Sequence, residues 1–559
     1  MKQERILIEN VLKYGINGAT TEVAEFIISN TYYYLASKKM IETYGEYDLI
    51  KIALEINEHN SKESIDSYFK YLDTLSIEDI REIIYMVLSG KTRYTRFFNE
   101  YSNNKLSELA IKLLSVDGAG HIVLDLGSGT GNFLANTYKY SIDNGFILKE
   151  LIGIELNVTQ VYLSNMAMQI IRCNEVHPFI KCANALDGIN NPYTLAYTFP
   201  PFGMRFTGNE KIINTKYEDI KFSNRNTTEW IFIDKLLKGK PNRAIALTTA
   251  KALYNDADKE YRNRVIKDGL LEGIIELPVG ALEFTGLKVC ILVFSNGNKT
   301  VKLIDASGVI DNSTKRFIRV ELPVDKILDM YKTETAETKT IEEAIECNNL
   351  VPSNALIKIK KPLNGILLSS KAEVFTGSQY TVKNFEEMFS NYNTGYKILT
   401  SSDIEDGLVN WNSLQNIDYK DTKFDKFAIR KNDVIVTSKS SKVKILVVDI
   451  DPKEKILVTG GMIIVRPDID KLDPTFLKIY LDSKQGQLVL KSIQKGTTII
   501  TLNSKDLSNI LIPDIDIKKQ RKKAELYNNK LSTLLAYKKE INKIENDLSN
   551  FYFDEFEGE

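Results

Sequence analysis

The chain has 559 residues, with 73 Lys plus Arg against 74 Asp plus Glu, and 43% of its residues are hydrophobic. This length predicts about three or four domains of ordinary soluble composition. Because the charges nearly cancel, a nucleic-acid-binding surface has to be a local patch. No apolar run approaches a membrane span and the start is too polar for a signal peptide, so we expect a cytoplasmic protein without a membrane partner.

Cysteine and histidine usage argues against metal and disulfide chemistry. The chain has four cysteines, and no pair of them has the CxxC spacing of a structural zinc site. Its three histidines, His59, His121 and His177, are too few and too scattered for a His-based metal or triad site. We therefore predict no bound metal.

Residues 1–97 have the pattern of a helical domain. Apolar residues recur at spacings of three and four, as in VAEFIISNTYYYLA and SIEDIREIIYMVL. Ser76 stands before an Ile-Glu-Asp start, where it is a suitable N-cap. We interpret this part as a small N-terminal helical bundle that packs against the next domain or contacts DNA.

Residues 98–330 alternate short β-type runs, such as HIVLDLG, ELIGIEL and RAIALTT, with helical patterns. Such alternation predicts an α/β domain in which a parallel sheet is covered by helices on both faces. The last two runs, KVCILVF and VKLID, are separated by the turn-rich SNGNKT, which predicts a hairpin.

Three further parts follow. Residues 331–362 form a charged, helix-forming connector, and residues 363–515 contain many short β-type runs typical of a separate, mostly β domain. Residues 516–559 predict one long C-terminal helix with a single apolar stripe, which is either ordinary packing or a dimer seam. The stripe consists of Tyr527, Leu531, Leu534, Tyr537, Ile541, Ile544, Leu548 and Phe551.

The strongest motif is VLDLGSGTGNF, which begins at Val123. A buried strand, an acidic residue and a glycine-rich turn before a helix let the backbone approach a ligand at the carboxyl end of the strand. A lone glycine-rich turn is weak evidence, since dinucleotide-binding folds use similar ones. The candidate cofactor residues in it are Asp125, Gly127, Ser128, Gly129, Gly131, Asn132 and Phe133.

The next two strands end in polar residues at suitable distances. Glu155 closes the second strand, where a carboxylate can accept both hydroxyls of a ribose. Asn184 and Asp187 follow the third strand and are candidates for contacting an adenine ring. The alternative is a plain α/β domain with capped strand ends, but three successive strand ends carry appropriate groups in order.

These residues carry a family resemblance. DLGSGTG, the acidic IEL and the later Pro-Pro-Phe-Gly resemble the N6-adenine DNA methyltransferases, and above all the modification subunit of type I restriction–modification systems. The likeness spans roughly residues 98–310 and implies a Rossmann-like fold with S-adenosylmethionine as cofactor. The family usually has a Thr-Pro pair before the first strand, where this chain has Ser102 and Asn103.

The family's catalytic loop reads Asn or Asp, Pro, Pro, aromatic, and the resemblance places Phe199, Pro200, Pro201 and Phe202 there. The aromatic residue stacks on a base flipped out of the duplex, which matches Phe202. Phe199 departs from the family because its side chain cannot accept a hydrogen bond from the target amine. Three interpretations remain: backbone carbonyls with Asn184 or Thr198 compensate, the chain binds without methylating, or residue 199 is an engineered change.

Residues 363–515 and the helix after them resemble one target-recognition domain of a type I specificity subunit. Runs such as AEVFTGSQY, YKILTSSDIEDGLV and RKNDVIVT carry this diffuse likeness. It implies double-stranded DNA as a partner, and basic groups near phosphates provide affinity. The candidate DNA contacts are Lys439, Lys442, Lys495 and Thr497. The basic runs 91–96 and 518–523 are further candidates.

We therefore predict a DNA N6-adenine methyltransferase of a restriction–modification or defence system. The alternative is a catalytically impaired subunit that binds S-adenosylmethionine and DNA. Pairing of two chains through the C-terminal helix is a hypothesis, and a monomer is equally permitted. Restriction itself would need a separate nuclease and translocase subunit, for which the chain has no plausible residues.

Overall fold

The computed structural model describes residues 20–556, apart from 59, 90–103, 117, 190–191, 205–211, 213–214, 283–285, 311–321, 335, 363, 379–381, 406, 419–421, 440–442 and 497–499. The chain forms two compact units, Met1–Leu356 and Ile357–Glu559. The boundary between them falls inside the predicted connector. The mixed α/β fold and the long C-terminal helix that the sequence predicts are confirmed.

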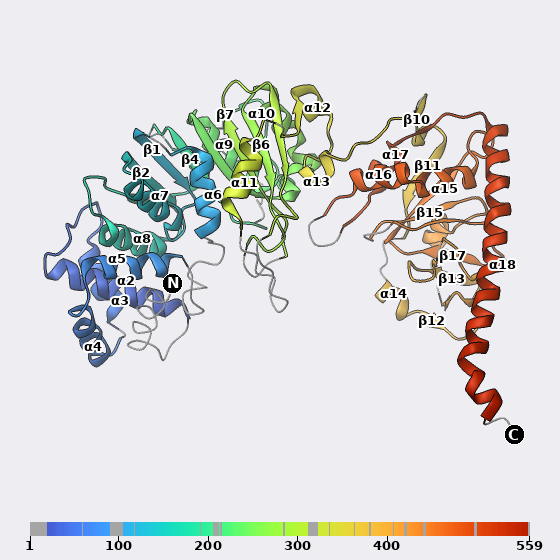
Figure 1. Cartoon of the computed structure of the whole chain (residues 1–559), viewed down its shortest axis with the longest axis horizontal. Helices are drawn as coiled ribbons and strands as arrows, with labels where there is room; N and C mark the ends of the chain where they lie inside the picture. The colour runs from blue at the N-terminus through green and yellow to red at the C-terminus, as the bar shows by residue number, and fades with distance from the viewer. Residues whose placement is uncertain are drawn as a thin grey trace. The chain divides into compact units, whose positions relative to one another are not determined.

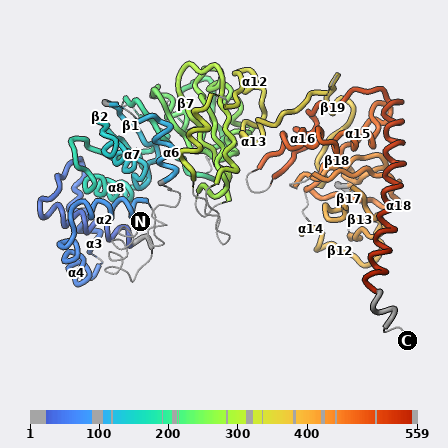
Figure 2. Tube along the Cα trace, viewed as in Figure 1, coloured from blue at the N-terminus to red at the C-terminus, as the bar shows by residue number. Residues whose placement is uncertain are grey.

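The first unit begins with helices that pack on the sheet domain. In chain order they are α2 (Thr20–Ser37), α3 (Leu49–Asn57), α4 (Lys62–Leu72) and α5 (Ile77–Leu88). Ser76 caps α5 as predicted, because its hydroxyl accepts from the Asp79 amide and the Asp79 carboxyl group accepts from the Ser76 amide. Helices α2 and α5 contact α8 (Val158–Ile171). Figure 2 shows α2, α3, α4 and α8 grouped at one end of the unit.

A nine-stranded sheet with the order β3-β2-β1-β4-β5-β7-β6-β8-β9 forms the centre of the first unit. Strands β1, β2, β3, β4 and β5 run parallel to one another, whereas β7 runs antiparallel between β5 and β6. The strands are β1 (Ala119–Leu126), β2 (Ile147–Glu155), β3 (Phe179–Cys182), β4 (Leu195–Thr198), β5 (Arg243–Thr249), β6 (Leu271–Glu276), β7 (Val289–Ser295), β8 (Thr300–Asp305) and β9 (Thr338–Thr340).

The predicted hairpin of KVCILVF with VKLID is wrong. These runs form β7 and β8, but β6 lies between them and pairs with both. The connecting segment is hydrogen-bonded to the turn before β6, since the amide of Asn298 donates to Gly269 and that of Ser295 donates to Leu270. The chain therefore passes around the start of β6 instead of folding back on β7.

Helices cover both faces of this sheet and enclose two apolar cores. One face carries α6 (Asn104–Leu114), α7 (Asn132–Asp143), α8 and α11 (Val324–Lys332). The other carries α9 (Thr228–Lys238), α10 (Lys259–Lys267), α12 (Ile341–Glu346) and α13 (Pro352–Ala355). Figure 1 shows the helices on either side of the strands. Burial on both faces is consistent with strands that read as nearly continuous apolar runs.

The second unit contains two four-stranded sheets, ordered β11-β18-β15-β16 and β12-β14-β13-β17, and a small pair, β10-β19. Helices α15 (Pro474–Asp482), α16 (Lys484–Ile493) and α17 (Ser504–Ser508) pack around them. The strands are β10 (Gly365–Leu367), β11 (Ala372–Thr376), β12 (Phe389–Ser390), β13 (Tyr396–Leu399), β14 (Asn416–Ile417), β15 (Val434–Thr437), β16 (Ile445–Val447), β17 (Lys455–Val458), β18 (Met462–Pro467) and β19 (Leu511–Pro513).

The last element is α18 (Ile517–Phe556), the long helix drawn in red in Figure 1. Its first turns pack on α15, where Gln520 and Ala524 are buried. Farther along, the predicted apolar stripe faces solvent, with Leu534, Tyr537, Ile541, Ile544 and Leu548 all more than half exposed. Across the described residues, no helix is both long and apolar enough to cross a membrane.

Candidate active site

The carboxyl ends of parallel strands meet at one edge of the sheet in the first unit. Strands β1, β2, β3, β4 and β5 all end there, because these five strands run parallel to one another. This edge brings together the glycine-rich turn after β1, Glu155 at the end of β2, and residues 184–187 after β3. It also carries residues 199–204 after β4, here called the transfer loop. Ligands of open α/β sheets bind at such an edge.

The glycine-rich turn is held against the neighbouring strand by backbone hydrogen bonds. The amides of Gly127 and Ser128 both donate to the Ile154 carbonyl at 2.9 Å. Glycines 127, 129 and 131 have φ values of +84°, +53° and +77°, a region that side-chain-bearing residues rarely adopt. Gly131 starts α7, which receives no capping side chain, so the first amides of this helix face the turn.

Three buried polar groups around this turn have no hydrogen-bond partner among the described residues. They are Asp125 Oδ1, Ser128 Oγ and Thr130 Oγ1, on residues that are 2%, 7% and 3% exposed. Burial, with a smaller effect of the Glu155 charge, raises the pKa of Asp125 well above its usual value. Buried polar atoms without partners are rare in folded proteins, so three together indicate a place where a polar ligand completes the bonding.

Glu155 lies at the end of β2 and is oriented by three backbone amides. Its Oε2 accepts from the amide of Gly129 at 2.9 Å, and its Oε1 accepts from the amides of Leu156 and Asn157 at 2.8 Å each. The side chain is half-buried. A carboxyl group fixed in this way is ready to accept further hydrogen bonds from ligand hydroxyls.

Asn184 and Asp187 follow β3 on the same edge and are both exposed. The Asn184 side-chain oxygen accepts from the Leu186 amide at 3.0 Å and caps a short 3₁₀ turn, Ala185–Asp187. The Ala183 amide donates to the Glu155 carbonyl, which joins this turn to the end of β2. The side-chain oxygen of Asn184 is therefore already engaged in a hydrogen bond within the turn, and the turn lies next to Glu155.

The remaining two candidates on α7 are buried. Phe133 is 4% exposed and stacks on Tyr197 of β4, with ring centroids 3.8 Å apart and planes 13° from parallel. Asn132 is also 4% exposed, and its Oδ1 accepts from Asn136 at 3.0 Å. Phe133 thus joins the start of α7 to β4, and Asn132 is bonded within α7.

The transfer loop places its two aromatic rings against each other. The centroids of Phe199 and Phe202 lie 5.1 Å apart at 51°, and both rings pack on the apolar core below. Pro200 is buried and Pro201 is exposed. Pro200 and Pro201 have no amide hydrogen, so the loop offers carbonyl acceptors but no backbone donor at these positions. Thr198, one of the predicted substitutes for an acceptor at residue 199, is fully buried and donates to another group.

The start of α9, which no sequence pattern singled out, contacts three parts of this edge. The Thr228 hydroxyl donates to the Met204 carbonyl at 2.8 Å. Glu229, 4% exposed, accepts from the Thr249 hydroxyl at 2.6 Å at the end of β5. Phe232 lies 3.3 Å from the position that a Cβ on Gly127 would take. No local signal marks these residues, because each partner is distant in the chain.

The second unit gathers several polar loops at one edge of the β11-β18-β15-β16 sheet. The Gly377 amide donates to Met462 at 2.9 Å, and the Ser438 amide donates to Gly461 at 2.8 Å. The Ser438 carbonyl accepts from the Leu502 amide. The segments after β11 and β15, the segment before β18, and the chain after α16 therefore meet at this edge, here called the loop edge.

Two of the four predicted DNA contacts can be placed at the loop edge. Lys439 is exposed beside Ser438. Lys495 forms a bridge with Thr501, and its ammonium group makes a 2.9 Å ion pair with Asp506, so its charge is partly neutralised. Lys442 and Thr497 lie outside the described residues, as do Ser102, Asn103 and the basic run 91–96.

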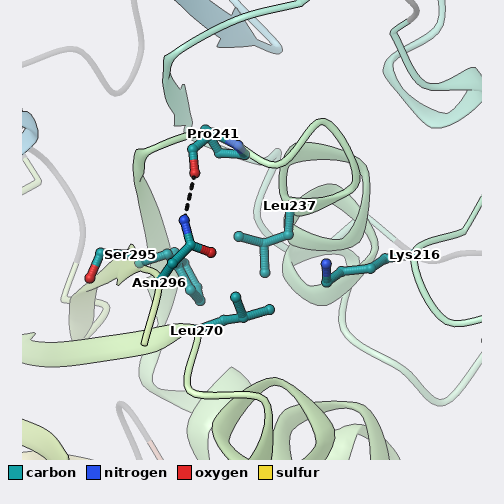
Figure 3. A pocket seen from close by; sticks show the side chains of 7 residues that line it. Lys216, Leu237, Pro241, Leu270, Ser295 and Asn296 are labelled. Atoms are coloured by element: carbon teal, nitrogen blue, oxygen red, sulfur yellow. Dashed lines mark hydrogen bonds between the residues drawn. The ribbon is translucent and has the colours of Figure 1, made fainter. Parts of the chain in front are cut away.

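A small pocket in the first unit lies away from these residues. Figure 3 shows its lining at the amino edge of β5, where the Asn296 side chain donates to the Pro241 carbonyl at 3.4 Å. Burial lowers the pKa of Lys216, which lines it. The described part of the chain contains no group of three or more His, Cys, Asp or Glu side chains arranged to hold a metal ion. The lining residues are Lys216, Leu237, Pro241, Leu270, Phe294, Ser295 and Asn296.

Parts of the chain are similar to known proteins. Residues 96–369 match the sequence model of the N-6 DNA methylase family. Over 152 residues the chain is 31% identical to the specificity subunit of the type I restriction enzyme EcoBI from Escherichia coli. That match covers 27% of the chain and 30% of the specificity subunit, so the chain spans less than a third of this relative.

Solved structures of restriction–modification proteins are among those similar to the chain. The type I methyltransferase subunit from Streptococcus thermophilus is 17% identical with a TM-score of 0.45, covering 55% of this chain and 71% of that one. A modification subunit of a putative type I enzyme from Vibrio vulnificus is 14% identical with a TM-score of 0.45, covering 61% and 93%. The type IIG restriction endonuclease BpuSI is 12% identical with a TM-score of 0.42, covering 94% and 74%.

Proposed function

Because residues 96–369 carry an N-6 DNA methylase domain, we propose that the chain is a site-specific DNA adenine methyltransferase of a restriction–modification system. The observation that carries this proposal is the convergence of three features at one sheet edge. These are the glycine-rich turn with its unpartnered polar groups, the oriented carboxyl group of Glu155, and the Phe-Pro-Pro-Phe transfer loop. A nucleoside site next to a stacking loop suits methylation of a base.

The residues at the edge fit S-adenosylmethionine as the cofactor. Glu155 would accept the ribose hydroxyls, since its oxygens are already oriented by amides. Asp125 would face the cationic end of the cofactor, and a positive charge there would favour its ionised form, against the effect of burial. Asn184 and Asp187 would border the adenine ring. When bound, this cofactor supplies a methyl group activated by its attachment to a sulfonium centre.

The transfer loop would position the target base. An adenine has to leave the duplex to reach this edge, and Phe202 would stack on it. The amino nitrogen is a poor nucleophile because its lone pair is delocalised into the ring. Carbonyl oxygens of the loop would accept its hydrogens and favour the tetrahedral nitrogen that attacks the methyl group. Fixed placement beside the methyl donor supplies much of the rate enhancement.

Residue 199 favours a second candidate function. The loop has a phenylalanine where an amide or carboxyl oxygen usually serves, and loss of one preorganised hydrogen bond costs on the order of 3–4 kcal/mol in a transition state. The alternative is therefore a subunit that binds S-adenosylmethionine and DNA without methylating. Such a subunit would act in a defence complex whose nuclease is another chain.

Long-read modification sequencing separates the two candidates. The chain is expressed alone in a host without adenine methylation, beside a Glu155→Ala variant that lacks the ribose-binding carboxyl group. Modified adenine at one recurrent sequence, absent with Glu155→Ala, is the expected result for the enzyme. No modification, together with calorimetric binding of both S-adenosylmethionine and duplex DNA, would favour the binding subunit. Phe199→Asn then tests whether an acceptor at this position restores transfer.

The second unit would provide DNA recognition. Support comes from the loop edge, where the exposed Lys439 stands beside Ser438. The chain is also similar to a specificity subunit over 152 residues. Basic side chains near phosphates give affinity, whereas base contacts give specificity. Lys439 would contact the phosphate backbone. Lys442 and Thr497 are proposed contacts from the sequence alone, since both lie outside the described residues. Lys495 would contribute less, because its charge is paired with Asp506.

The exposed side of α18 suggests a further partner. The apolar stripe of α18 is exposed over most of its length, which supports pairing with the same helix of a second copy. Two copies would then present two recognition units to a divided DNA site. Cleavage of unmodified DNA would require a separate restriction subunit.

A further inference from the structure

Threonine hydroxyls hold both ends of the transfer loop. Where the chain leaves β4, the Thr198 hydroxyl donates to the Leu126 carbonyl at 2.7 Å. Beyond the two aromatic rings, the Met204 carbonyl accepts from the Thr228 hydroxyl at 2.8 Å. The two threonines are 0% and 3% exposed. The bond of Thr198 is buried, so water does not compete for it, whereas the bond of Thr228 is part-buried because Met204 is exposed. The loop is thus fixed at one end to the strand β1 and at the other to the helix α9.

The anchoring helix is itself tied to two neighbouring parts of the edge. Next to Thr228, Glu229 accepts from both the amide and the hydroxyl of Thr249, at 3.3 and 2.6 Å. One turn later, the Phe232 ring packs against Gly127. Before the helix, the Asp258 carboxyl group accepts from the amide and hydroxyl of Thr227. These contacts fix the first turn of α9, so Thr228 is a rigid support and not a mobile tether.

This anchoring matters because the loop has no acceptor side chain at residue 199. Phe199 offers only its backbone, and Pro200 and Pro201 lack amide hydrogens. The groups left to accept hydrogens from a target amine are carbonyl oxygens, whose directions are set by the backbone of the loop. A side-chain acceptor adjusts through its own torsions, whereas a carbonyl moves only with the chain. For methyl transfer, the orientation of the loop would therefore have to replace the missing side chain.

We propose that Thr228 is a positioning residue that orients the carbonyl acceptors of the transfer loop. The proposal rests on the proposed methyltransferase function, because it assigns Thr228 a part in that reaction. Thr228 does not touch the reacting atoms and acts through the Met204 carbonyl. Removal of its hydroxyl should loosen the end of the loop without altering the glycine-rich turn or the loop edge of the second unit.

The test compares three variants of the full chain. Thr228→Val removes the hydroxyl while keeping the shape, and Thr228→Ser keeps the hydroxyl. Thr31→Val is the matched control, because Thr31 is fully buried and its hydroxyl bonds the Tyr68 hydroxyl at 2.7 Å in the N-terminal helices. The readouts are hydrogen exchange of the amides of residues 202–204 in cofactor-free protein, thermal unfolding, and the maximal methyl-transfer rate at saturating DNA and cofactor.

We expect faster exchange at residues 202–204 in Thr228→Val alone. Its maximal rate should fall about tenfold, as for loss of one hydrogen bond of ordinary strength, with the KM for DNA unchanged. Thr228→Ser should restore both values, and Thr31→Val should lower thermal stability without affecting either.

Each other outcome has a definite meaning. Unchanged exchange in Thr228→Val overturns the anchor, whatever happens to the rate. Faster exchange with an unchanged maximal rate overturns the role in positioning. If the wild-type chain transfers no methyl group, the proposed function fails, and with it the part of Thr228 in the reaction, while exchange still decides whether Thr228 anchors the loop.

Discussion

The glycine-rich turn allows packing and ligand approach to be separated with two alanine substitutions. Gly131 has a φ of +77°, and a Cβ added there would lie 2.8 Å from Met168 Cε and 3.3 Å from Ser164 Cβ. Gly129 has a φ of +53°, but the nearest atom to an added Cβ is Gln160 Oε1 at 4.0 Å. Both substitutions strain the backbone, and only the one at Gly131 also meets the packed surface of α8.

The expected magnitudes follow from these distances. A left-handed conformation costs an alanine roughly 1–2 kcal/mol, so Gly129→Ala should lower the free energy of unfolding by about that amount. Overpacking adds about 1–3 kcal/mol. The addition for Gly131→Ala should lie at the lower end, because Met168 Cε ends a flexible side chain, although Ser164 cannot move without α8. We expect Gly131→Ala to cost about 2–4 kcal/mol in total.

Urea unfolding followed by tryptophan fluorescence measures this difference. The chain has two tryptophans, Trp230 and Trp411, of which Trp230 is fully buried in the first unit. In a Trp411→Phe background, the signal reports on the first unit alone. Equal destabilisation by Gly129→Ala and Gly131→Ala would refute the packing argument. Calorimetry with S-adenosylmethionine should give the opposite order. Gly129→Ala should weaken cofactor binding more than Gly131→Ala does, although it lowers stability less.

Three further predictions concern pH, DNA binding and association. Burial raises the pKa of Asp125, so its contribution to stability is present below about pH 4 and is lost as the pH rises through the pKa of the folded state. Asp125→Asn should therefore gain melting temperature relative to the wild type between pH 4 and 8 without cofactor, whereas a constant difference would contradict this. Lys439→Ala should weaken duplex DNA binding and reduce the salt slope by about one, unlike Lys453→Ala on a different segment; equal effects would remove Lys439 from the interface. Ile541→Asp should shift a dimer to monomer in sedimentation, and a wild-type monomer with and without DNA would exclude the pairing.

The sequence predicted those parts of the candidate site whose local geometry depends on short patterns. The turn around Gly129 and the acidic end of β2 at Glu155 follow from short motifs, since a buried strand followed by glycines restricts the backbone locally. The order of the strands was less accessible. The turn between β7 and β8 has the composition of a hairpin, yet the segment bonds to Gly269 before β6. A distant strand therefore decided the topology, and no feature near residue 296 indicates it.

Contacts between distant residues were beyond the sequence patterns altogether. Lys495 has the surroundings of a phosphate contact, but its charge is paired with Asp506, which follows in a separate helix. Thr228 reads as an ordinary first residue of a helix, and its acceptor lies on Met204, 24 residues earlier. Composition and periodicity indicate where a side chain sits in an element, and they do not identify its partner across a loop.

The departure at Phe199 and the anchor at Thr228 lead to one joint prediction, because both concern how an amino group is held. If oriented carbonyls replace the missing acceptor, the effect of Thr228→Val should depend on residue 199. In a Phe199→Asn background, an amide side chain would accept one hydrogen and adjust to small movements of the loop. The fall in maximal rate caused by Thr228→Val should then shrink from about tenfold to about twofold, which is the coupling expected for residues that serve one contact. Single-turnover rates of the four combinations measure it, with thermal unfolding as a check on folding. The same fold-change in both backgrounds would mean that the two residues act independently and that the carbonyls of the loop do not substitute for the amide.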